Sequence, residues 1–235
     1  MNWIQEITIE EDLMHSTTVI VRVKNEEQLI GNALQSIIDH IDNAKIIIVD
    51  NNSSDNSINI ARLFQHDTSK PKSDRYADIE IIKINEYSPG KAINLALKKV
   101  NTENLLLLSS HCEISKYSCE LVNNLLETHV AVFGKQVPRY FGKRIVPRYI
   151  WSHYGEEASI NMFSNLEDRY FLHNAFCCYK TDFLKKNLFN ENLVGKEDRY
   201  WANDVIKAGR TYIYEPNLVC QHHFTNNGNT WRGID

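Results

Sequence analysis

The 235-residue sequence lacks the features that mark several common protein classes. No apolar run approaches the roughly 20 residues that a membrane-spanning helix needs. The opening stretch, MNWIQEITIEEDLM, has no cationic start followed by an apolar segment, so we expect no secretory signal. The net charge of −4 provides no overall basic field for binding nucleic acid. These absences predict a cytoplasmic protein without a nucleic-acid partner.

Two further absences concern cysteines and glycine-rich loops. The five cysteines are odd in number and have no C-x-x-C or zinc-knuckle spacing, which indicates free thiols in a reducing compartment. The first apolar strand is not followed by G-x-G-x-x-G, and no G-x-x-x-x-G-K-[ST] occurs. A dinucleotide site of the common type and a P-loop are therefore disfavoured.

What the first half does contain is an alternation of apolar strands and amphipathic helices. We predict strands over residues 17–23, 45–50, 79–84 and 105–109. Helices are predicted after a cap at Asn25, over 55–64, and after the Ser88-Pro89-Gly90 start. Strands this apolar fit a parallel sheet that is covered on both faces. A ligand is expected beyond their carboxyl ends.

The second half alternates less regularly. Residues 131–141 suggest strand pieces around a turn, and 175–187 a strand that leads into a short helix. Residues 197–209 suggest a helix that ends at Gly209, and 211–223 two short strands. No Pro, Gly or Ser-rich linker separates the halves. We therefore expect one domain over 1–235, with a nucleotide-binding half at 17–113 and an acceptor-binding half at 130–235.

Polar residues cluster where two of the predicted strands end. The stretch LLLLSSHCE, residues 105–113, places serines and a histidine directly after a buried strand. Asp50 ends another strand and is followed by NNSSDNS. An aspartate at such a position can accept a hydrogen bond from a base or ribose, whereas the plainer interpretation is a strand-turn-helix connection.

Several motifs, taken together and in order, resemble family 2 glycosyltransferases with the GT-A fold. The nucleotide-binding half of that family is similar to TTVIVRVKNEEQLIGNALQSI, IIIVDNNSSDNSINIA and SPGKAINLALKKVNTENLLLLS. Its Glu-Asp motif, helix, strand and trailing histidine are similar to GKEDRYWANDVIKAGRTYIYEPNLVCQHH. The resemblance implies an α/β GT-A fold whose central sheet is mainly parallel. It also implies inverting transfer of a sugar from a nucleotide-sugar donor to a glycan or lipid-linked acceptor, in bacterial capsule or lipopolysaccharide synthesis.

The resemblance also assigns roles to individual residues. Asp50 would contact the nucleotide base, Lys91 and Asn94 would lie near the donor, and Asp198, beside Glu197, would be the general base. For the Glu-Asp pair the plain alternative is a helix start that is stabilised by acids, and both can hold. The other donor-site residues that we expect are Arg22, Lys24, Asn25, Glu26, Asn52, Ser109, Ser110 and His111.

The metal-binding motif departs from the family pattern. Where the family usually has Asp-x-Asp, this chain has Ser109-Ser110-His111, a poor set of ligands for Mg²⁺. A softer ion such as Mn²⁺ could use His111 with Glu113 and His222 or His223. Strand alternation allows only one of the last two to face the site, and His222 aligns better with the family's trailing histidine.

Three interpretations of this departure stay open at this stage. A divalent ion is held by fewer ligands, or the enzyme needs no metal and His111, Lys91 or arginines stabilise the leaving phosphate. The second case would suit a CMP-linked sugar, which has less charge to neutralise. The third interpretation is a non-catalytic module that binds a nucleotide sugar or glycan. A sugar nucleotidyltransferase ranks below these, because VRVKNEE lacks the glycines that its phosphate loop needs.

An aromatic and basic stretch is the candidate for acceptor binding. The segment QVPRYFGKRIVPRYIWSHYGEE has two Pro-Arg-Tyr repeats, and aromatic rings stack on sugars while arginine pairs with phosphate. The plainer interpretation is a surface loop with packed aromatics. Any membrane contact would be peripheral, at the inner face of the cell membrane. The expected acceptor-site residues are Arg139, Arg148, Trp151, His173 and Asn174.

Overall fold

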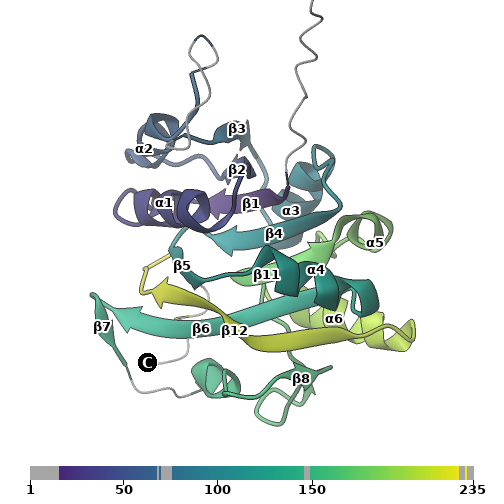
Figure 1. The fold of residues 1–235 in the computed structure, drawn as a ribbon. Helices are drawn as coiled ribbons and strands as arrows, with labels where there is room; N and C mark the ends of the chain where they lie inside the picture. Colours follow the sequence, from purple (N-terminus) through teal and green to yellow (C-terminus); the bar gives the residue numbers. More distant parts are fainter. Residues whose placement is uncertain (1–15, 68, 70–75, 146–148, 228–230, 232–235) are drawn as a thin grey trace, which may run out of the picture.

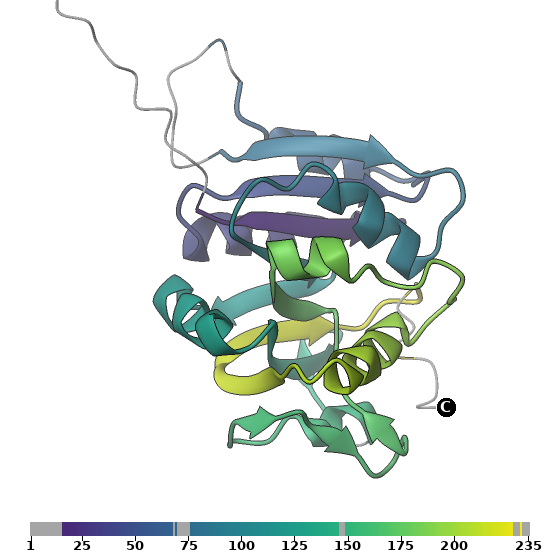
Figure 2. The same cartoon turned by 90° about the vertical axis from the view of Figure 1, so that its right-hand side faces the viewer.

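Strands and helices alternate along the chain in a computed structural model that describes residues 16–67, 69, 76–145, 149–227 and 231. Figures 1 and 2 show the strands stacked in one twisted sheet with helices on its flanks. The strands are β1 (Thr18–Val23), β2 (Lys45–Asp50), β3 (Asp78–Lys83), β4 (Asn104–Ser109), β5 (Cys112–Lys116), β6 (Ala131–Tyr140), β7 (Lys143–Arg144), β8 (Ser159–Ile160), β9 (Phe163–Ser164), β10 (Arg169–Tyr170), β11 (Phe176–Lys180) and β12 (Tyr212–His223). The helices are α1 (Ile30–His40), α2 (Ser57–Leu63), α3 (Pro89–Leu97), α4 (Cys119–Thr128), α5 (Thr181–Lys186), α6 (Glu197–Lys207) and the 3₁₀ helix η1 (Tyr149–His153).

The described residues form a ten-stranded mixed sheet in the order β3-β2-β1-β4-β11-β6-β12-β5, with β7 and β8 attached to β6 and β12. The pairs from β3 to β4 are parallel, and so is the pair of β6 with β12. Strand β11 is antiparallel to both of its neighbours. The sheet is thus a mixed α/β sheet whose first half has the predicted parallel order.

The sheet curls back on itself between β4 and β5. Only Ser110 and His111 separate these strands along the chain, yet β5 pairs with β12 at the far edge of the sheet. Three Cα-to-Cα steps span at most about 11 Å, so the far edge must approach the end of β4. His111 therefore lies where the two halves of the sheet meet.

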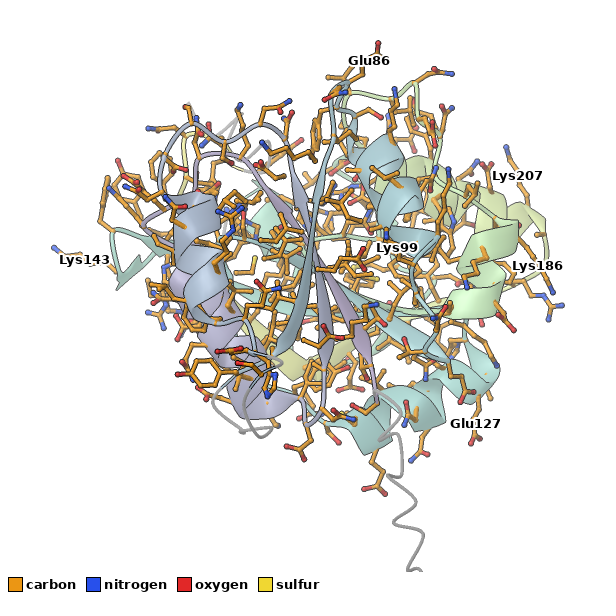
Figure 3. All side chains as sticks on the ribbon, turned by 90° about the horizontal axis from the view of Figure 1, so that it is seen from above. Glu86, Lys99, Glu127, Lys143, Lys186 and Lys207 are labelled. Atoms are coloured by element: carbon orange, nitrogen blue, oxygen red, sulfur yellow. The ribbon has the colours of Figure 1, made fainter. Side chains whose placement is uncertain are left out.

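Each face of the sheet carries its own apolar core. On β2, Ile47 and Val49 pack into the core that includes α3, α5 and α6, whereas Ile46 and Ile48 pack into the core that includes α1 and α4. This alternation follows from the two-residue period of a strand. Figure 3, which views the molecule from above, shows the helices on both sides of the strands. Burying one such side chain contributes roughly 1.5–3 kcal/mol.

Most local signals of the first half hold in the structure. Strand β2 has the predicted bounds, and Ser88 Oγ accepts a hydrogen bond from Lys91 N at the start of α3. In the second half, Gly209 has a φ of +67° just after α6, as a helix-ending glycine does. The prediction that Asn25 caps the following helix is wrong. Its backbone is left-handed, with φ 50°, and α1 begins only at Ile30.

The second half departs further from the predictions. Residues 212–223 form one strand rather than two, with a shift of register between Glu215 and Val219 beside Pro216, which has no N–H for the ladder. Strand β6 runs unbroken to Tyr140 instead of in pieces. Strand β5 and helix α4 had no counterpart in the predictions. None of the helices in the described ranges is both long and apolar enough to span a bilayer.

Candidate active site

A cavity of about 500 Å³ opens at the carboxyl ends of β1 and β4. Its walls combine residues from distant parts of the chain. From the first half come Arg22, Glu26, Ser110 and His111, and from the second half Glu197 and Asp198. Polar groups that converge on one cavity at the ends of parallel strands are the arrangement expected of a ligand site in an α/β protein.

Two loops on the side of the cavity where the donor is expected are tied to each other. Lys24 Nζ donates to the carbonyl oxygen of Asn52 at 2.6 Å, and Asn25 Oδ1 accepts from Ser54 N at 2.8 Å. Asn52 in turn donates to the carbonyl of Ile84 at 3.0 Å, and its φ of 52° is left-handed. Lys24 also lines the cavity, whereas Asn25 and Asn52 hold the loops that form its wall.

Three residues expected at the donor, Asp50, Lys91 and Asn94, have other partners in the structure. Asp50 is 1% exposed, and its Oδ1 accepts from Ser53 N at 2.9 Å. Lys91 pairs with Glu86 on the surface at 2.8 Å. The Asn94 amide bonds both backbone groups of Phe189, donating to the carbonyl at 2.8 Å and accepting from the N–H at 3.2 Å. None of the three is among the cavity-lining residues in the described part of the chain.

The Glu-Asp pair opens helix α6 inside the cavity. The residue before it, Lys196, has a left-handed φ of 60°, which turns the chain sharply into the helix. Glu197 Oε1 lies 3.3 Å from Arg22 Nη1 and accepts from Asn174 Nδ2 at 3.2 Å. Burial and the charge of Asp198 raise the pKa of Glu197, and Arg22 opposes this rise.

Asp198 has a different environment from its neighbour. Its Oδ2 accepts from Asn174 N at 3.0 Å and from Arg199 Nη1 at 2.9 Å, and its Oδ1 accepts from Arg199 N at 2.9 Å. Asp198 thus accepts three hydrogen bonds from N–H groups, and the residue is only 5% exposed. The Asp198 carboxylate is therefore held in one position at the cavity.

His111, which lines the cavity, packs against the buried His222. The ring centroids of His111 and His222 are 4.9 Å apart, and His222 is fully buried. His111 Nδ1 lies 3.3 Å from Glu26 Oε1 without hydrogen-bond geometry. His223 instead lies 3.3 Å from Glu113, so the alternation places only His222 at the site. Glu113 was expected to be a metal ligand together with His111 and His222, but it pairs with His223 instead. Cys112 is the residue that lies close to His111 and His222.

These side chains form a group of possible metal ligands. The ligand atoms of His111, Cys112 and His222 all lie within 4.8 Å of one another. Burial, followed by the nearby charge of His111, holds the pKa of His222 well below its ordinary value, so this imidazole is neutral. Burial and the neighbouring Cys220 raise the pKa of the Cys112 thiol well above its usual range. The imidazole nitrogens of this group can therefore ligate an ion directly. Cys112 can ligate as a thiolate only if the ion displaces the thiol proton.

The expected acceptor residues divide into three groups. His173 and Asn174 line the cavity. Trp151 is 1% exposed and packs edge-on against His222, with ring centroids 4.9 Å apart, while Tyr149 and Ile150 line the cavity beside it. Arg139 donates to Gln221 Oε1 at 2.6 Å and is not among the described lining residues. Arg148 lies outside the described residues.

Several site residues were missed by sequence reasoning. Arg199 directly follows the Glu-Asp pair, and its position could have suggested an ion pair. Gln136 is a buried polar residue within the largely apolar strand β6, which is itself a signal of function. Thr225 Oγ1 donates to Glu26 Oε1 at 3.0 Å, and Asn227 Nδ2 donates to the carbonyls of Lys24 and Asn25. No local sequence pattern marks the tail after β12, which contains Thr225 and Asn227, because the partners of these residues are distant in sequence.

The mixed sheet, its helices on both faces and the acidic pair at the start of α6 match the GT-A fold expected of a glycosyltransferase. The family model for glycosyl transferase family 2 matches residues 18–193, so the chain belongs to this family. A comparison with curated protein sequences gave no match.

Solved structures of several transferases share the fold. Staphylococcus aureus TarS 1-349 in complex with UDP-GlcNAc is 21% identical, with a TM-score of 0.67 over 91% of this chain. A mannosyltransferase from Pyrobaculum calidifontis, in complex with GDP-Man and Mn²⁺, is 20% identical, with a TM-score of 0.62 over 91%. GalNAc-T7 with UDP, GalNAc and Mn²⁺ is 12% identical, with a TM-score of 0.66 over 93%. The chain spans 60%, 58% and 45% of these three structures, respectively.

Proposed function

We propose that the protein is an inverting glycosyltransferase that moves a sugar from a nucleotide-sugar donor to a glycan or lipid-linked acceptor. The observation that carries this proposal is that Asp198 lines the same cavity as Ser110, His111 and Arg22. The proposed base thus faces the same cavity as the polar and cationic residues that would contact the donor phosphate. The fold is shared with structures that hold UDP-GlcNAc or GDP-Man, which supports a nucleotide-sugar donor.

The proposed reaction is a single displacement. The acceptor hydroxyl attacks the anomeric carbon on the face opposite the leaving phosphate. Its proton passes to a carboxylate oxygen of Asp198, a new glycosidic bond forms, and the bond to the donor phosphate breaks with inversion. Arg199 and the Asn174 N–H hold the Asp198 carboxylate, so its position is set before the acceptor arrives. Arg22 contributes positive charge on the donor side.

We also propose that a divalent ion binds on the donor side of the cavity. His111 and His222 are the residues that would hold it, because His111 lines the cavity, the ligand atoms of the two lie within 4.8 Å of each other, and His222 Nε2 is buried with no hydrogen-bond partner in the described structure. Imidazole ligands suit Mn²⁺ better than Mg²⁺. When bound, the ion would neutralise charge on the donor phosphate. Mn²⁺ is present in two of the structures that share the fold.

The pathway and cellular location are part of the same proposal. A cytoplasmic enzyme of bacterial surface-polysaccharide synthesis, capsule or lipopolysaccharide, would meet its nucleotide sugar in the cytoplasm and a lipid-linked acceptor at the inner face of the membrane. Peripheral contact with that membrane is sufficient for such a role.

Asp198→Asn is the variant that tests the chemistry. It keeps the size of the side chain but removes the base, so turnover of the productive donor should fall by about 10²–10⁴-fold. The nucleotide itself should still raise the melting temperature. Asp204→Asn, on the exposed side of the same helix, is the matched control and should leave turnover unchanged.

The donor is found by thermal shift with UDP, GDP, dTDP and CMP and their sugar conjugates, each with Mn²⁺, Mg²⁺ or EDTA. A stabilising diphosphate that requires Mn²⁺ supports the proposed ion. A CMP conjugate that stabilises equally in EDTA contradicts it. Donor binding without any turnover, unchanged in Asp198→Asn, would make the protein a non-catalytic nucleotide-sugar-binding module.

A further inference from the structure

A series of hydrogen bonds runs from the backbone to the buried histidine of the site. Ala175 N lies 3.3 Å from His173 Nδ1. The Gln136 side chain lies between the two histidines, 3.0 Å from His173 Nδ1 and 2.8 Å from His222 Nδ1. All three side chains are buried, with exposures of 6%, 1% and 0% for His173, Gln136 and His222.

The direction of every proton in this series follows from its first member. A backbone N–H can only donate, so His173 Nδ1 must accept and carries no proton. The Gln136 atom that faces His173 Nδ1 must then be the amide nitrogen. The amide oxygen of Gln136 consequently faces His222 Nδ1, and an oxygen there requires Nδ1 to donate. His222 therefore holds its proton on Nδ1.

The other ring nitrogen of His222 is left with a lone pair. His222 Nε2 is buried and has no hydrogen-bond partner among the described residues. A proton on it would be a buried donor without an acceptor, which is costly. His111, whose ring centroid is 4.9 Å from that of His222, and Cys112 are the other members of the ligand group.

We propose that Gln136 and His173 are positioning residues, which lock His222 in the tautomer that presents the Nε2 lone pair to a divalent ion. This inference rests on the proposed donor site. It distinguishes a His222 that ligates a metal ion from a His222 that donates a hydrogen bond to the donor phosphate. A lone pair can ligate Mn²⁺, Co²⁺ or Zn²⁺, whereas it cannot donate a hydrogen bond to a leaving phosphate. Metal-bound histidines usually donate their other N–H to an oxygen, as His222 does to Gln136.

Two substitutions of Gln136 separate this role from simple packing. In Gln136→Leu the oxygen that fixes the His222 proton is lost. In Gln136→Glu a carboxylate oxygen still accepts from His222 Nδ1, but the amide that donated to His173 is gone. The proposal therefore expects the leucine variant to release the His222 tautomer and the glutamate variant to keep it.

The tautomer is measured directly by long-range ¹H–¹⁵N correlation spectra of the full chain with labelled histidine imidazoles. His222 is assigned through contacts to Trp151, whose ring is adjacent, so no histidine variant is needed. The wild type should show the proton on Nδ1, and Gln136→Leu should show it wholly or partly on Nε2. A wild-type His222 with its proton on Nε2 overturns the proposal.

Metal affinity is measured by titrating Mn²⁺ alone and following its electron paramagnetic resonance. Gln136→Leu should bind about 10–100-fold more weakly than the wild type, the usual cost of losing a partner behind a metal ligand. Gln136→Glu should stay close to the wild type. Equal affinity in Gln136→Leu, equal losses in both variants, or no binding by the wild type would each overturn the inference.

Neither measurement uses a sugar donor or turnover. Loss of the transferase proposal through Asp198→Asn would therefore leave the tautomer and the Mn²⁺ affinity standing. Conversely, an active transferase with the wrong His222 tautomer would refute the positioning role alone.

Discussion

Arg22 Nη1, at the end of β1, lies 3.3 Å from Glu197 Oε1, at the start of α6, and the two residues are 175 positions apart. The side chains are 16% and 6% exposed, so the pair is largely shielded from water. It also joins the side of the cavity expected to hold the donor to the side that carries the acidic pair. The two walls of the site are thus connected by charge.

Replacing Arg22 by Gln should lower the free energy of unfolding by about 3 kcal/mol, because Glu197 is left buried without its counter-charge. The pKa of Glu197, already raised by burial and by Asp198, should rise further. Urea unfolding at pH 7.5 measures the change. Lys91→Gln, which removes the exposed pair with Glu86, is the control and should show no measurable change. Equal effects of the two variants would contradict a structural role for the Arg22 pair.

Gly90→Ala should destabilise the protein by about 1–3 kcal/mol, since an added methyl group must be accommodated against fixed backbone. A Cβ at Gly90 would lie 2.6 Å from the carbonyl oxygen of Asn190, in the segment that leads to α6. Displacing that segment should also lower turnover. Thermal unfolding and donor turnover are the measurements.

Gly31→Ala is the matched control for that substitution. The nearest atom to its added Cβ would be 3.6 Å away, an ordinary contact, and the residue lies within helix α1. Alanine should therefore raise the free energy of unfolding by about 0.5–1 kcal/mol. A loss of stability at Gly31 as large as that at Gly90 would mean that the close backbone approach is not the cause.

Acid should destabilise the fold through its buried histidines. Burial holds the pKa of His173 and of His222 well below its ordinary value of about 6.5. Below that pH the unfolded chain binds protons that the folded chain does not, so the free energy of unfolding falls as the pH falls. The slope is at most about 1.4 kcal/mol per pH unit for each histidine.

Urea unfolding at pH 7.5, 6.5 and 5.5 tests this sign. His173→Gln should show a shallower decline, because one of the two protonation sites is gone. The raised pKa of Glu197 acts in the opposite direction, and only near the pH at which that carboxyl takes up its proton. A stability that is constant from pH 7.5 to 5.5 would contradict the burial of neutral histidines.

Thr225→Val should weaken nucleotide binding and lower the free energy of unfolding by about 1 kcal/mol. Its hydroxyl donates to Glu26 Oε1, the atom that also lies 3.3 Å from His111 Nδ1. Without that bond both Glu26 and the tail after β12 lose a restraint. Isothermal titration with the best nucleotide measures the affinity. Thr128→Val, at the exposed end of α4, should change neither quantity beyond about 0.5 kcal/mol.

The elements that were predictable from sequence depend on contacts close in the chain. Strand β2 has a continuous apolar centre and its predicted bounds, and Ser88-Pro89 marks the start of α3 through a cap and a proline at the first turn. Strand β5 could not be anticipated, because its place beside β12 depends on how the whole sheet curls. Pro216, which looks like a break between strands, is absorbed as a bulge within β12.

The site residues likewise divide into those that motifs could predict and those that depend on distant contacts. Asp198 and His111 were found from motifs, and the structure brings both to one cavity. Asn94 and Lys91 were assigned to the donor from a motif, yet Asn94 holds the segment before α6 and Lys91 pairs on the surface. Sequence spacing cannot show which way a helix presents its polar residues once another segment packs against it. Gln136 has its role only through two histidines that are 37 and 86 positions away.

The tail contact has a consequence for biosynthesis. Thr225 reaches back to Glu26 across 199 positions, and His222 completes the group begun by His111. At a synthesis rate of about 5–20 residues per second, these partners emerge some 10–40 s after Glu26 does. During that interval a growing chain has its parallel strands but no assembled site. A nascent chain therefore should not bind a nucleotide or a metal ion until its last strand has left the ribosome.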